Sequence, residues 1–439
     1  MSNKRVVITG LGVVSPIGCD LDTIWSNLTN GKSGITPIAH MPTNALPVKS
    51  GAECKSFTGD IEDYGQLDKQ TQRAIKKNMK VMCREIEMGV AAAQKALQHS
   101  GLGETRDPER CGCLFGCDYI LSRPEEYADG MYNCQQPGNA TTQDVAGWAA
   151  AWPFHGLNKV NPLWLLKYLP NMPNSHVSIY NDFRGPNNAL TVREASMHLS
   201  VAEAASIIDR GAADVMLVGS TGSRIQPVRA THACLIDRLA SEQSDPTMMS
   251  RPFDASCDGM VLGEGAAAIM LESLEHAQAR GAKIWGEVVG SGSAMSGPHA
   301  GRDFMQQSTF NALRVCVQRA TERLGKQWHL HAQGLSDPQV DQSEAAAISK
   351  LFDQLGYQGP VTAAKSYFGN LGAGGAGVEL ICSLLALDRG SLFPILNLKQ
   401  PMSAAKWPAA TIGTNPGKGF VHCSCTMQGQ SASIAIVAA

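Results

Sequence analysis

The strand, turn and helix that meet near residue 194 constrain the fold of this chain more than any other feature. Residues 185–190 are strand-like, a turn follows, and a helical stretch runs from about residue 194 to residue 210. The helix stops before Gly211, and the apolar residues 213–219 are typical of a buried strand. We call this strand-turn-helix element the elbow. It places Glu194 in the first turn of a helix, where the helix dipole favours a negative charge, so a structural role for Glu194 stays open.

Strand and helix signals continue on both sides of the elbow. A strand over residues 6–8 opens the chain, and a strand over residues 283–290 opens a second half. Residues 70–99 are predicted to be helical because apolar residues recur there at helical spacing. These residues are Ile75, Met79, Met82, Ile86 and Val90. We divide the chain into an N-terminal half, residues 1–281, and a C-terminal half, residues 282–439.

The elbow and several shorter motifs resemble the β-ketoacyl-acyl carrier protein synthase family. Residues 185–187, Gly-Pro-Asn, match the strand before that family's active-site turn. The first strand and loop, residues 4–18, and the motifs at 250–254, 258–260 and 263–265 match the family as well. Taken together the motifs are highly specific, and the resemblance covers nearly the whole chain. It implies an α/β thiolase fold with two similar halves, five α-β-α-β-α layers and a dimer built edge to edge.

The resemblance places altered residues at all three catalytic positions of the family. Glu194 stands where the nucleophilic cysteine would be, Gln333 replaces the first catalytic histidine, and Asn370 replaces the second. A carboxylate is a weak nucleophile and cannot simply receive an acyl chain from a thioester. The two amides donate hydrogen bonds but have no proton to shuttle near neutral pH. The three changes together predict a subunit that does not condense.

Charged residues of the family's active-site surroundings are retained. Lys365, Asp341 and Glu379 match a polar cluster beside the triad. A buried carboxylate at Glu194 needs partners, or its pKa must rise. We expect it to pair with backbone amides at the helix start, or with Arg193 or Lys365. We interpret the retained cluster as a scaffold that keeps buried polar groups satisfied.

Two further positions concern the acyl chain. Residues 426–431 match the family's Gly-Phe-Gly-Gly-Thr-Asn loop, and Met427 replaces the phenylalanine that gates entry of the acyl chain. The chain therefore lacks the glycine hinge and the aromatic gate of a loop that must open. Tyr119 falls where the family lines its acyl tunnel. A core aromatic without a tunnel role is an equal alternative for Tyr119.

Within the family, the losses are most similar to the chain length factor, also called KSβ, and residues 168–176 resemble that subunit in aryl polyene pathways. This resemblance implies a heterodimer in which the chain pairs with an active β-ketoacyl synthase and helps set the length of a polyketide or polyene chain. The alternatives are a decarboxylase that makes primer from malonyl carrier protein and a purely structural partner. The two lost histidines argue against the decarboxylase.

Composition excludes several other classes. The net charge is −2, so nothing favours nucleic-acid binding. No apolar run is long enough to span a membrane, and no signal peptide is recognised, which predicts a cytoplasmic protein. The 13 cysteines are irregularly spaced, which is typical of free thiols in a reducing compartment.

Three weaker patterns concern ligands and partners. The glycine-rich stretch 371–379 lacks the acidic residue of a dinucleotide site, so no cofactor is expected. The stretch 422–425, His-Cys-Ser-Cys, has no second pair of suitable spacing, so no metal site is expected. The basic residues Lys76, Lys77, Lys80 and Arg84 match the region that meets the acidic acyl carrier protein in related synthases, but a solvated helix face explains them equally well.

Overall fold

The computed structural model describes residues 4–103, 106–301 and 303–439. Its main sheet has ten strands in the order β10-β9-β11-β12-β8-β1-β7-β6-β4-β5. The strands of the N-terminal half are β1 (Val6–Val14), β4 (Cys111–Cys117), β5 (Asn187–Leu190), β6 (Val215–Ser223) and β7 (Glu264–Ser273). Those of the C-terminal half are β8 (Gly286–Met295), β9 (His329–His331), β10 (Val361–Thr362), β11 (Gly419–Cys425) and β12 (Gln430–Val437). β1 and β8 join the two halves by antiparallel pairing of Val6 with Val288.

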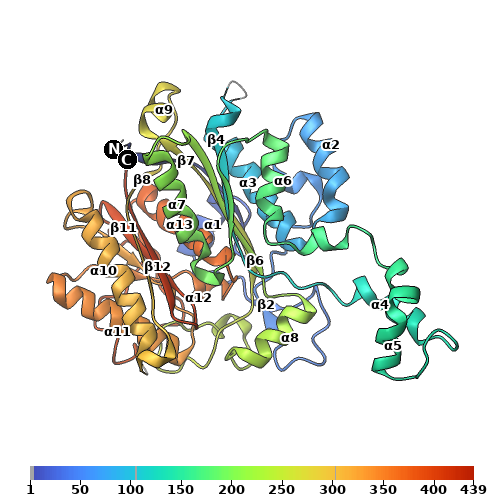
Figure 1. The fold of residues 1–439 in the computed structure, drawn as a ribbon. Helices are drawn as coiled ribbons and strands as arrows, with labels where there is room; N and C mark the ends of the chain where they lie inside the picture. Colours follow the sequence, from blue (N-terminus) through green and yellow to red (C-terminus); the bar gives the residue numbers. More distant parts are fainter. Residues whose placement is uncertain (1–3, 104–105, 302) are drawn as a thin grey trace.

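Helices cover the sheet on both sides and fill the space between its two halves (Figure 1). α3 (Arg84–Ser100) packs on β1, β6 and β7, and α6 (Met172–Asn181) packs on β4. α7 (Ser196–Asp209) and α13 (Gly374–Arg389) contact strands of both halves, so they form the central layer. α10 (Phe304–Leu324) packs on β8, β11 and β12, and α11 (Pro338–Leu355) packs on α10. The chain thus has the five α-β-α-β-α layers of the thiolase fold, as the sequence predicted.

The remaining elements are short and lie around this core. They are α1 (Leu21–Thr29), α2 (Lys69–Asn78), α4 (Glu125–Gln135), α5 (Val145–Ala151), α8 (Pro227–Ile236), α9 (Leu274–Ala279), α12 (Lys365–Phe368) and the strand pair β2 (Thr36–Pro37) and β3 (Ser50–Gly51). Short 3-10 turns precede α3 at Met79–Val81 and α7 at Arg193–Ala195. Where the chain is described, no helix is both long and apolar enough to cross a membrane.

The predicted helix over residues 70–99 is interrupted. α2 ends at Asn78, a short 3-10 turn follows, and α3 begins at Arg84. Met82 and Cys83 between them have extended backbones and are buried. The break lets Arg84 turn inward, where its Nη2 lies 2.7 Å from Oε1 of the buried Glu264. Apolar spacing alone does not reveal this break, because the apolar residues on both sides of it keep the helical period.

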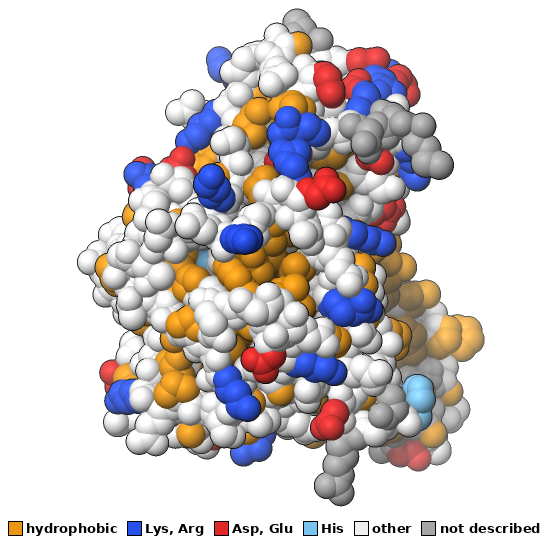
Figure 2. Space-filling model, turned by 90° about the vertical axis from the view of Figure 1, so that its left-hand side faces the viewer, with side chains coloured by type: hydrophobic (Ala, Val, Ile, Leu, Met, Phe, Trp, Pro, Cys, Tyr) orange, Lys and Arg blue, Asp and Glu red, His pale blue; other side chains and the backbone are white. Residues whose placement is uncertain are grey.

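Exposed apolar side chains gather on one projecting part of the molecule. α4 and α5 stand away from the body (Figure 1), and the segment from α4 to residue 168 carries several exposed apolar residues. They are Met131, Tyr132, Val145, Phe154, Leu157, Leu163 and Leu165. We call this segment, residues 125–168, the arm. A second face of the molecule shows an apolar patch with separate Lys and Arg side chains around it (Figure 2).

Candidate active site and its surroundings

Glu194 lies at the junction that the sequence predicted, between β5 and α7. β5 is the edge strand of the sheet and runs parallel to β4, and a short 3-10 turn carries the chain into α7. Arg193 in this turn has a φ of 51°, in the left-handed region that residues with a side chain rarely adopt. The turn directs Glu194 inward, and its side chain is buried. The elbow therefore presents a carboxylate to the interior, at the end of the central helical layer.

Three groups hold the Glu194 carboxylate as an anion. Arg224 Nη2 donates to its Oε1 at 2.5 Å, Asn370 Nδ2 donates to the same oxygen at 3.1 Å, and Arg193 Nε lies 3.8 Å from Oε2. Burial alone would raise the pKa of Glu194, but the charges of Arg224 and Arg193 and the Asn370 hydrogen bond outweigh it and lower that pKa to about 2. Two cationic partners were predicted from the sequence. Arg193 lies 3.8 Å from the carboxylate, whereas Lys365 pairs with Glu379 instead.

Arg224 is the residue that sequence reasoning missed. It follows β6 directly, is buried, and donates from its other terminal nitrogen to Asp237 Oδ2 at 2.9 Å. Next to it, Arg229 donates to Asp118 at 2.7 Å. Two arginines and three carboxylates thus form a buried set of alternating charges. The available signal was a charged residue five positions after the apolar stretch 213–219, but its partner lies 30 positions away in the chain.

The two amide positions do different things. Asn370 connects Glu194 to the backbone at Gly372. Its Nδ2 donates to Glu194, and its Oδ1 accepts from the Gly372 N–H at 3.0 Å. Gln333 faces β11 instead. Its Nε2 donates to the Cys425 carbonyl at 3.0 Å, and its Oε1 accepts from the Cys425 N–H. Both the nitrogen and the oxygen of the Gln333 side-chain amide therefore form hydrogen bonds with the backbone of Cys425.

The retained charged residues divide into two groups in the structure. Lys365 Nζ donates to Glu379 Oε2 at 2.6 Å, and both side chains are buried. Asp341 instead accepts the backbone N–H groups of Leu335, Ser336 and Phe253, all within 2.9 Å. The three residues were expected to form one polar cluster. In the structure Lys365 and Glu379 form an ion pair, and Asp341 accepts hydrogen bonds from the loop after β9.

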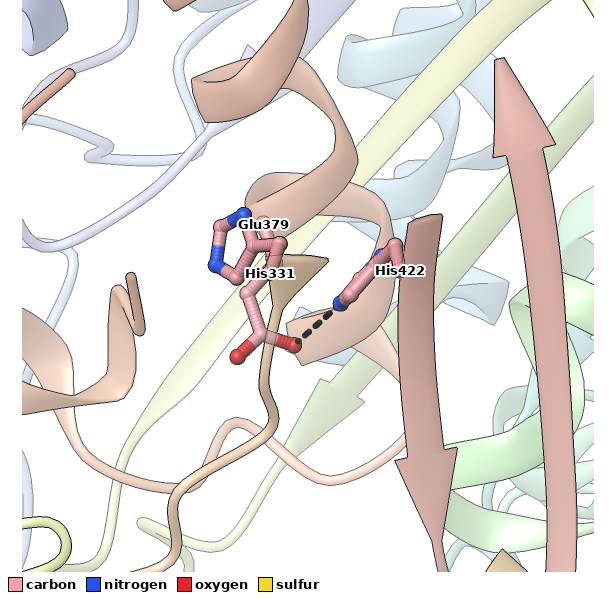
Figure 3. A group of neighbouring side chains, drawn as sticks. All are labelled: His331, Glu379 and His422. Atoms are coloured by element: carbon pink, nitrogen blue, oxygen red, sulfur yellow. Dashed lines mark ion pairs between the residues drawn. The ribbon is translucent and has the colours of Figure 1, made fainter. Parts of the chain in front are cut away.

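Histidines lie around the Lys365–Glu379 pair, and of these the sequence drew attention only to His422, within the stretch 422–425. Glu379 lies on α13. His331, at the end of β9, and His422, on β11, lie close to its carboxylate (Figure 3). His422 Nε2 lies 3.4 Å from Glu379 Oε2, and the rings of His198 and His422 are 4.5 Å apart. Strand alternation puts Cys423 and Cys425 on the opposite face of β11 from His422, so the segment 422–425 does not form one ligand set.

Tyr119 and Met427, the two residues expected to line the acyl tunnel and its gate, lie in different parts of the structure. The Tyr119 hydroxyl lies 2.5 Å from His232 Nδ1, and the Arg229 guanidinium lies 3.8 Å from the centre of its ring. Met427 sits in the turn between β11 and β12 and packs against a small cluster that includes Met305 and Leu335. Gly429 in the same turn has a φ of 88°, so one glycine with a conformation that side chains disfavour remains there.

A cavity of about 370 Å³ lies beside this wall of the site. Leu121, two residues after Tyr119, lines it together with Ile225 and Gln226, which follow Arg224. The start of α3 and part of the arm close the other sides, with Glu85 and Lys167 among the lining residues. The loop that carries Tyr119 therefore contributes Leu121 to the wall of this cavity.

The site offers no activated nucleophile in the position of the carboxylate. Burial raises the pKa of the Cys425 thiol well above its usual range, and burial likewise raises the pKa of the Cys117 thiol. Protonated thiols react poorly, because the thiolate is the nucleophilic form. The contacts that Glu194 makes with the described residues Arg224, Asn370 and Arg193 are ion pairs and hydrogen bonds.

The fold agrees with the comparisons to known proteins. Residues 3–277 match the N-terminal domain of β-ketoacyl synthases, and residues 285–399 match their C-terminal domain. The chain belongs to the β-ketoacyl synthase family. The 3-oxoacyl-acyl-carrier-protein synthase 2 of Coxiella burnetii is 31% identical over 413 residues, which cover 91% of this chain and 90% of that protein.

Several solved structures share the fold of this chain. The ishigamide ketosynthase/chain length factor matches with a TM-score of 0.79 and 22% identity over 100% of both chains. A β-ketoacyl synthase from Burkholderia phymatum matches with a TM-score of 0.81 and 22% identity over 99% of this chain and 100% of that chain. At these identities the likeness establishes the fold.

Proposed function

We propose that this chain is a non-condensing subunit that pairs with an active β-ketoacyl synthase and helps set the length of the acyl chain made on an acyl carrier protein. The observation that carries the proposal is the environment of Glu194. A carboxylate occupies the nucleophile's position at the elbow, and Arg224, Arg193 and Asn370 hold it as a buried anion. A carboxylate held in this way is a poor acyl acceptor.

Family relatives argue for the opposite possibility, that the chain condenses. The similar protein of Coxiella burnetii is named as a synthase. Condensation in that family, as the sequence motifs imply it, uses a cysteine and two histidines, and this chain has Glu194, Gln333 and Asn370 at those positions. Gln333 is also fully engaged with the Cys425 backbone. These features favour the non-condensing role over the synthase role.

Two structural features support pairing with a second thiolase-fold chain. β5 ends the sheet next to the elbow, and an unpaired strand edge is a ready site for pairing. The arm carries a group of exposed apolar side chains, and such patches mark protein–protein contacts. The heterodimer of a ketosynthase and a chain length factor is the arrangement that the name of the ishigamide structure describes.

Intact-mass spectrometry tests the non-condensing role. The chain is co-purified with a synthase partner and incubated with an acyl thioester on carrier protein. We expect the acyl mass to appear on the partner alone. An acyl adduct on this chain would overturn the proposal. Release of carbon dioxide from malonyl carrier protein by a complex whose partner lacks its cysteine would instead favour the primer-forming decarboxylase.

A further inference from the structure

The loop that follows β4 is held by side chains of α8 and its N-cap residue. Among the described residues, no backbone-to-backbone hydrogen bond involves residues 119–122. Four side-chain contacts instead connect the loop, which begins at residue 118, to residues 226–232. The loop carries Tyr119 and leads into the arm. The contacts that fix this loop therefore also fix the position of the Tyr119 ring.

Arg229 makes two of the four contacts. Its Nη2 donates to Asp118 Oδ2 at 2.7 Å, and its guanidinium carbon lies 3.8 Å from the centre of the Tyr119 ring. A cation over an aromatic ring is attracted by the ring's quadrupole, and this attraction is stronger where water is excluded. The side chains of Arg229 and Asp118 are only 3% and 5% exposed. One buried guanidinium thus binds the side chains of two consecutive loop residues.

The position of Arg229 is itself fixed by a neighbouring side chain. Gln226, the buried N-cap residue of α8, accepts the backbone N–H of Arg229 at 2.7 Å. Its Nε2 donates to the Leu121 carbonyl at 2.7 Å. Arg229 is therefore held at its backbone by Gln226 and at its charged end by Asp118. A side chain that is fixed at both ends is a rigid support for the ring that it contacts.

The Tyr119 hydroxyl has a weaker hold. Its partner is Nδ1 of His232, three positions after Arg229 on α8. Both Tyr119 and His232 are partly exposed. Water can replace a hydrogen bond at a partly exposed position, so the net contribution of that bond is small. The burial of Arg229 therefore favours the guanidinium, rather than the hydroxyl contact, as the group that holds the ring.

We propose that Arg229 is a positioning residue for product length, because it holds the Tyr119 ring in the wall of the partner's acyl tunnel. This inference rests on the proposed function, since the ring must face that tunnel for its position to matter. Without the guanidinium, the preference of the ring for its held position falls about 2- to 30-fold. The ring then turns aside in a fraction of the complexes, and these accept further methylenes.

Product analysis of a heterodimer that carries Arg229→Met tests the proposal. We expect the ratio of longer to normal-length product to rise at least about twofold, and by less than in Tyr119→Ala, where the ring is absent. Arg280→Met is the matched control, because it removes an arginine from another buried carboxylate, that of Glu272, outside the loop and α8. Its products should have the wild-type lengths. An unchanged distribution in Arg229→Met, or an equal shift in Arg280→Met, overturns the proposal.

Double variants distinguish positioning of the ring from a general loss of stability. Because Arg229 acts through the ring, Arg229→Met should change nothing further in a Tyr119→Ala background. In a Tyr119→Phe background, which keeps the ring, its effect should persist. Non-additivity of this kind is the signature of two residues that act through one contact. An equal shift with and without the ring would contradict the positioning role.

A second pair of variants keeps the test decisive if Arg229→Met does not fold. Loss of the arginine leaves the buried Asp118 carboxylate without its cation, and Asp118→Asn removes that charge. Asp118→Asn/Arg229→Met is therefore compared with Asp118→Asn, and the same lengthening is expected. If Tyr119→Ala lengthens the products and neither Arg229 variant does, this inference fails and the proposed function stands. If no variant at either position changes product length, the length-setting function fails as well.

Discussion

The guanidinium of Arg224 donates a 2.5 Å hydrogen bond to the carboxylate of Glu194 at the turn between β5 and α7. Both side chains are buried, and the other terminal nitrogen of Arg224 binds Asp237 at 2.9 Å. Glu194 therefore has a charged partner from a different part of the chain. This pairing explains how the elbow accommodates a carboxylate, and it makes the stability of the site depend on Arg224.

Replacing Arg224 should destabilise the protein more than replacing Glu194. Arg224→Met leaves two buried carboxylates, Glu194 and Asp237, without their main partner, which costs about 3–5 kcal/mol in the free energy of unfolding. Glu194→Ala leaves Arg224 paired with Asp237, so we expect a smaller loss of about 1–3 kcal/mol. Denaturant unfolding measures both, with the exposed Glu322→Ala as control. Equal stability of Arg224→Met and wild type would contradict this role of the arginine.

The pH dependence of stability should carry the signature of Glu194. The folded pKa of Glu194 is lowered to about 2: burial would raise it, but Arg224 and Arg193 outweigh that effect. A carboxyl group with a lowered folded pKa stabilises the protein above its unfolded pKa and loses that stabilisation as the pH falls toward the folded value. The stability advantage of wild type over Glu194→Gln should thus be full above about pH 5 and shrink between about pH 4.5 and 2.

The comparison with Glu194→Gln is needed because other carboxyl groups titrate in the opposite sense. Burial raises the pKa of Glu344 to about 7, and burial also raises that of Glu87 to about 7. Both groups occur in wild type and variant, so their contributions cancel in the difference. A difference that stays constant from pH 7 to pH 2 would show that the carboxylate is not held as described.

Restoring the missing nucleophile should not restore condensation. Glu194→Cys supplies a thiol, but Gln333 and Asn370 still lack the histidine chemistry that the family motifs imply, and Gln333 stays bound to Cys425. We expect no condensation product when the variant replaces the wild-type chain in a complex whose partner lacks its cysteine. Product formation in mass spectra would show that one substitution separates this chain from an active synthase.

Tyr119 should affect product length through its ring. If the loop after β4 caps the partner's acyl tunnel, Tyr119→Ala opens space toward the cavity that Leu121 lines and shifts products to longer chains. The reason is steric, since forcing further methylenes against a packed wall costs about 1–3 kcal/mol. Tyr119→Phe is the matched control, because it keeps the ring and removes only the contact with His232.

Product analysis of heterodimers that carry Tyr119→Ala or Tyr119→Phe distinguishes a role of the ring from a role of the hydroxyl. Turnover should be roughly preserved in both variants, and only Tyr119→Ala should change the length distribution. An unchanged distribution in Tyr119→Ala would remove this residue from the length-setting account.

The chain alone should behave poorly in solution. The exposed apolar residues of the arm and the unpaired edge of β5 are surfaces that a partner would cover. Light scattering at micromolar concentration should show aggregation of the lone chain and a well-defined complex after co-expression with the synthase. A stable lone monomer would count against an obligate partner.

The sequence predicts the fold well where the signal is local. The apolar runs of β1 and β6, the elbow and a strand that follows residue 283 are visible as short motifs. The interruption at Met82 and Cys83 is not, because it depends on the distant Glu264 that draws Arg84 inward. Local periodicity carries no information about such a tertiary ion pair.

The site was predictable in position and less so in its contacts. Glu194 and Asn370, two of the positions that the resemblance assigns to the triad, lie 3.1 Å apart, although Asn370 was not among the partners expected for Glu194. Arg224 was not predicted, because the packing of β6 beside the elbow, rather than sequence proximity, brings it to Glu194. The proximity of His331 to His422 was not predicted for the same reason. They lie on neighbouring parallel strands, where only the register places them opposite each other.

A condensation assay on a complex with an inactivated partner tests the central claim most directly. The chain is co-expressed with its synthase after the partner's nucleophilic cysteine has been replaced by alanine, and the complex receives acyl and malonyl carrier proteins. The account predicts that no β-ketoacyl product forms, whereas the complex with the intact partner is active. Formation of β-ketoacyl product by the inactivated complex would contradict it, because the only elbow left to catalyse the reaction would be the one that carries Glu194.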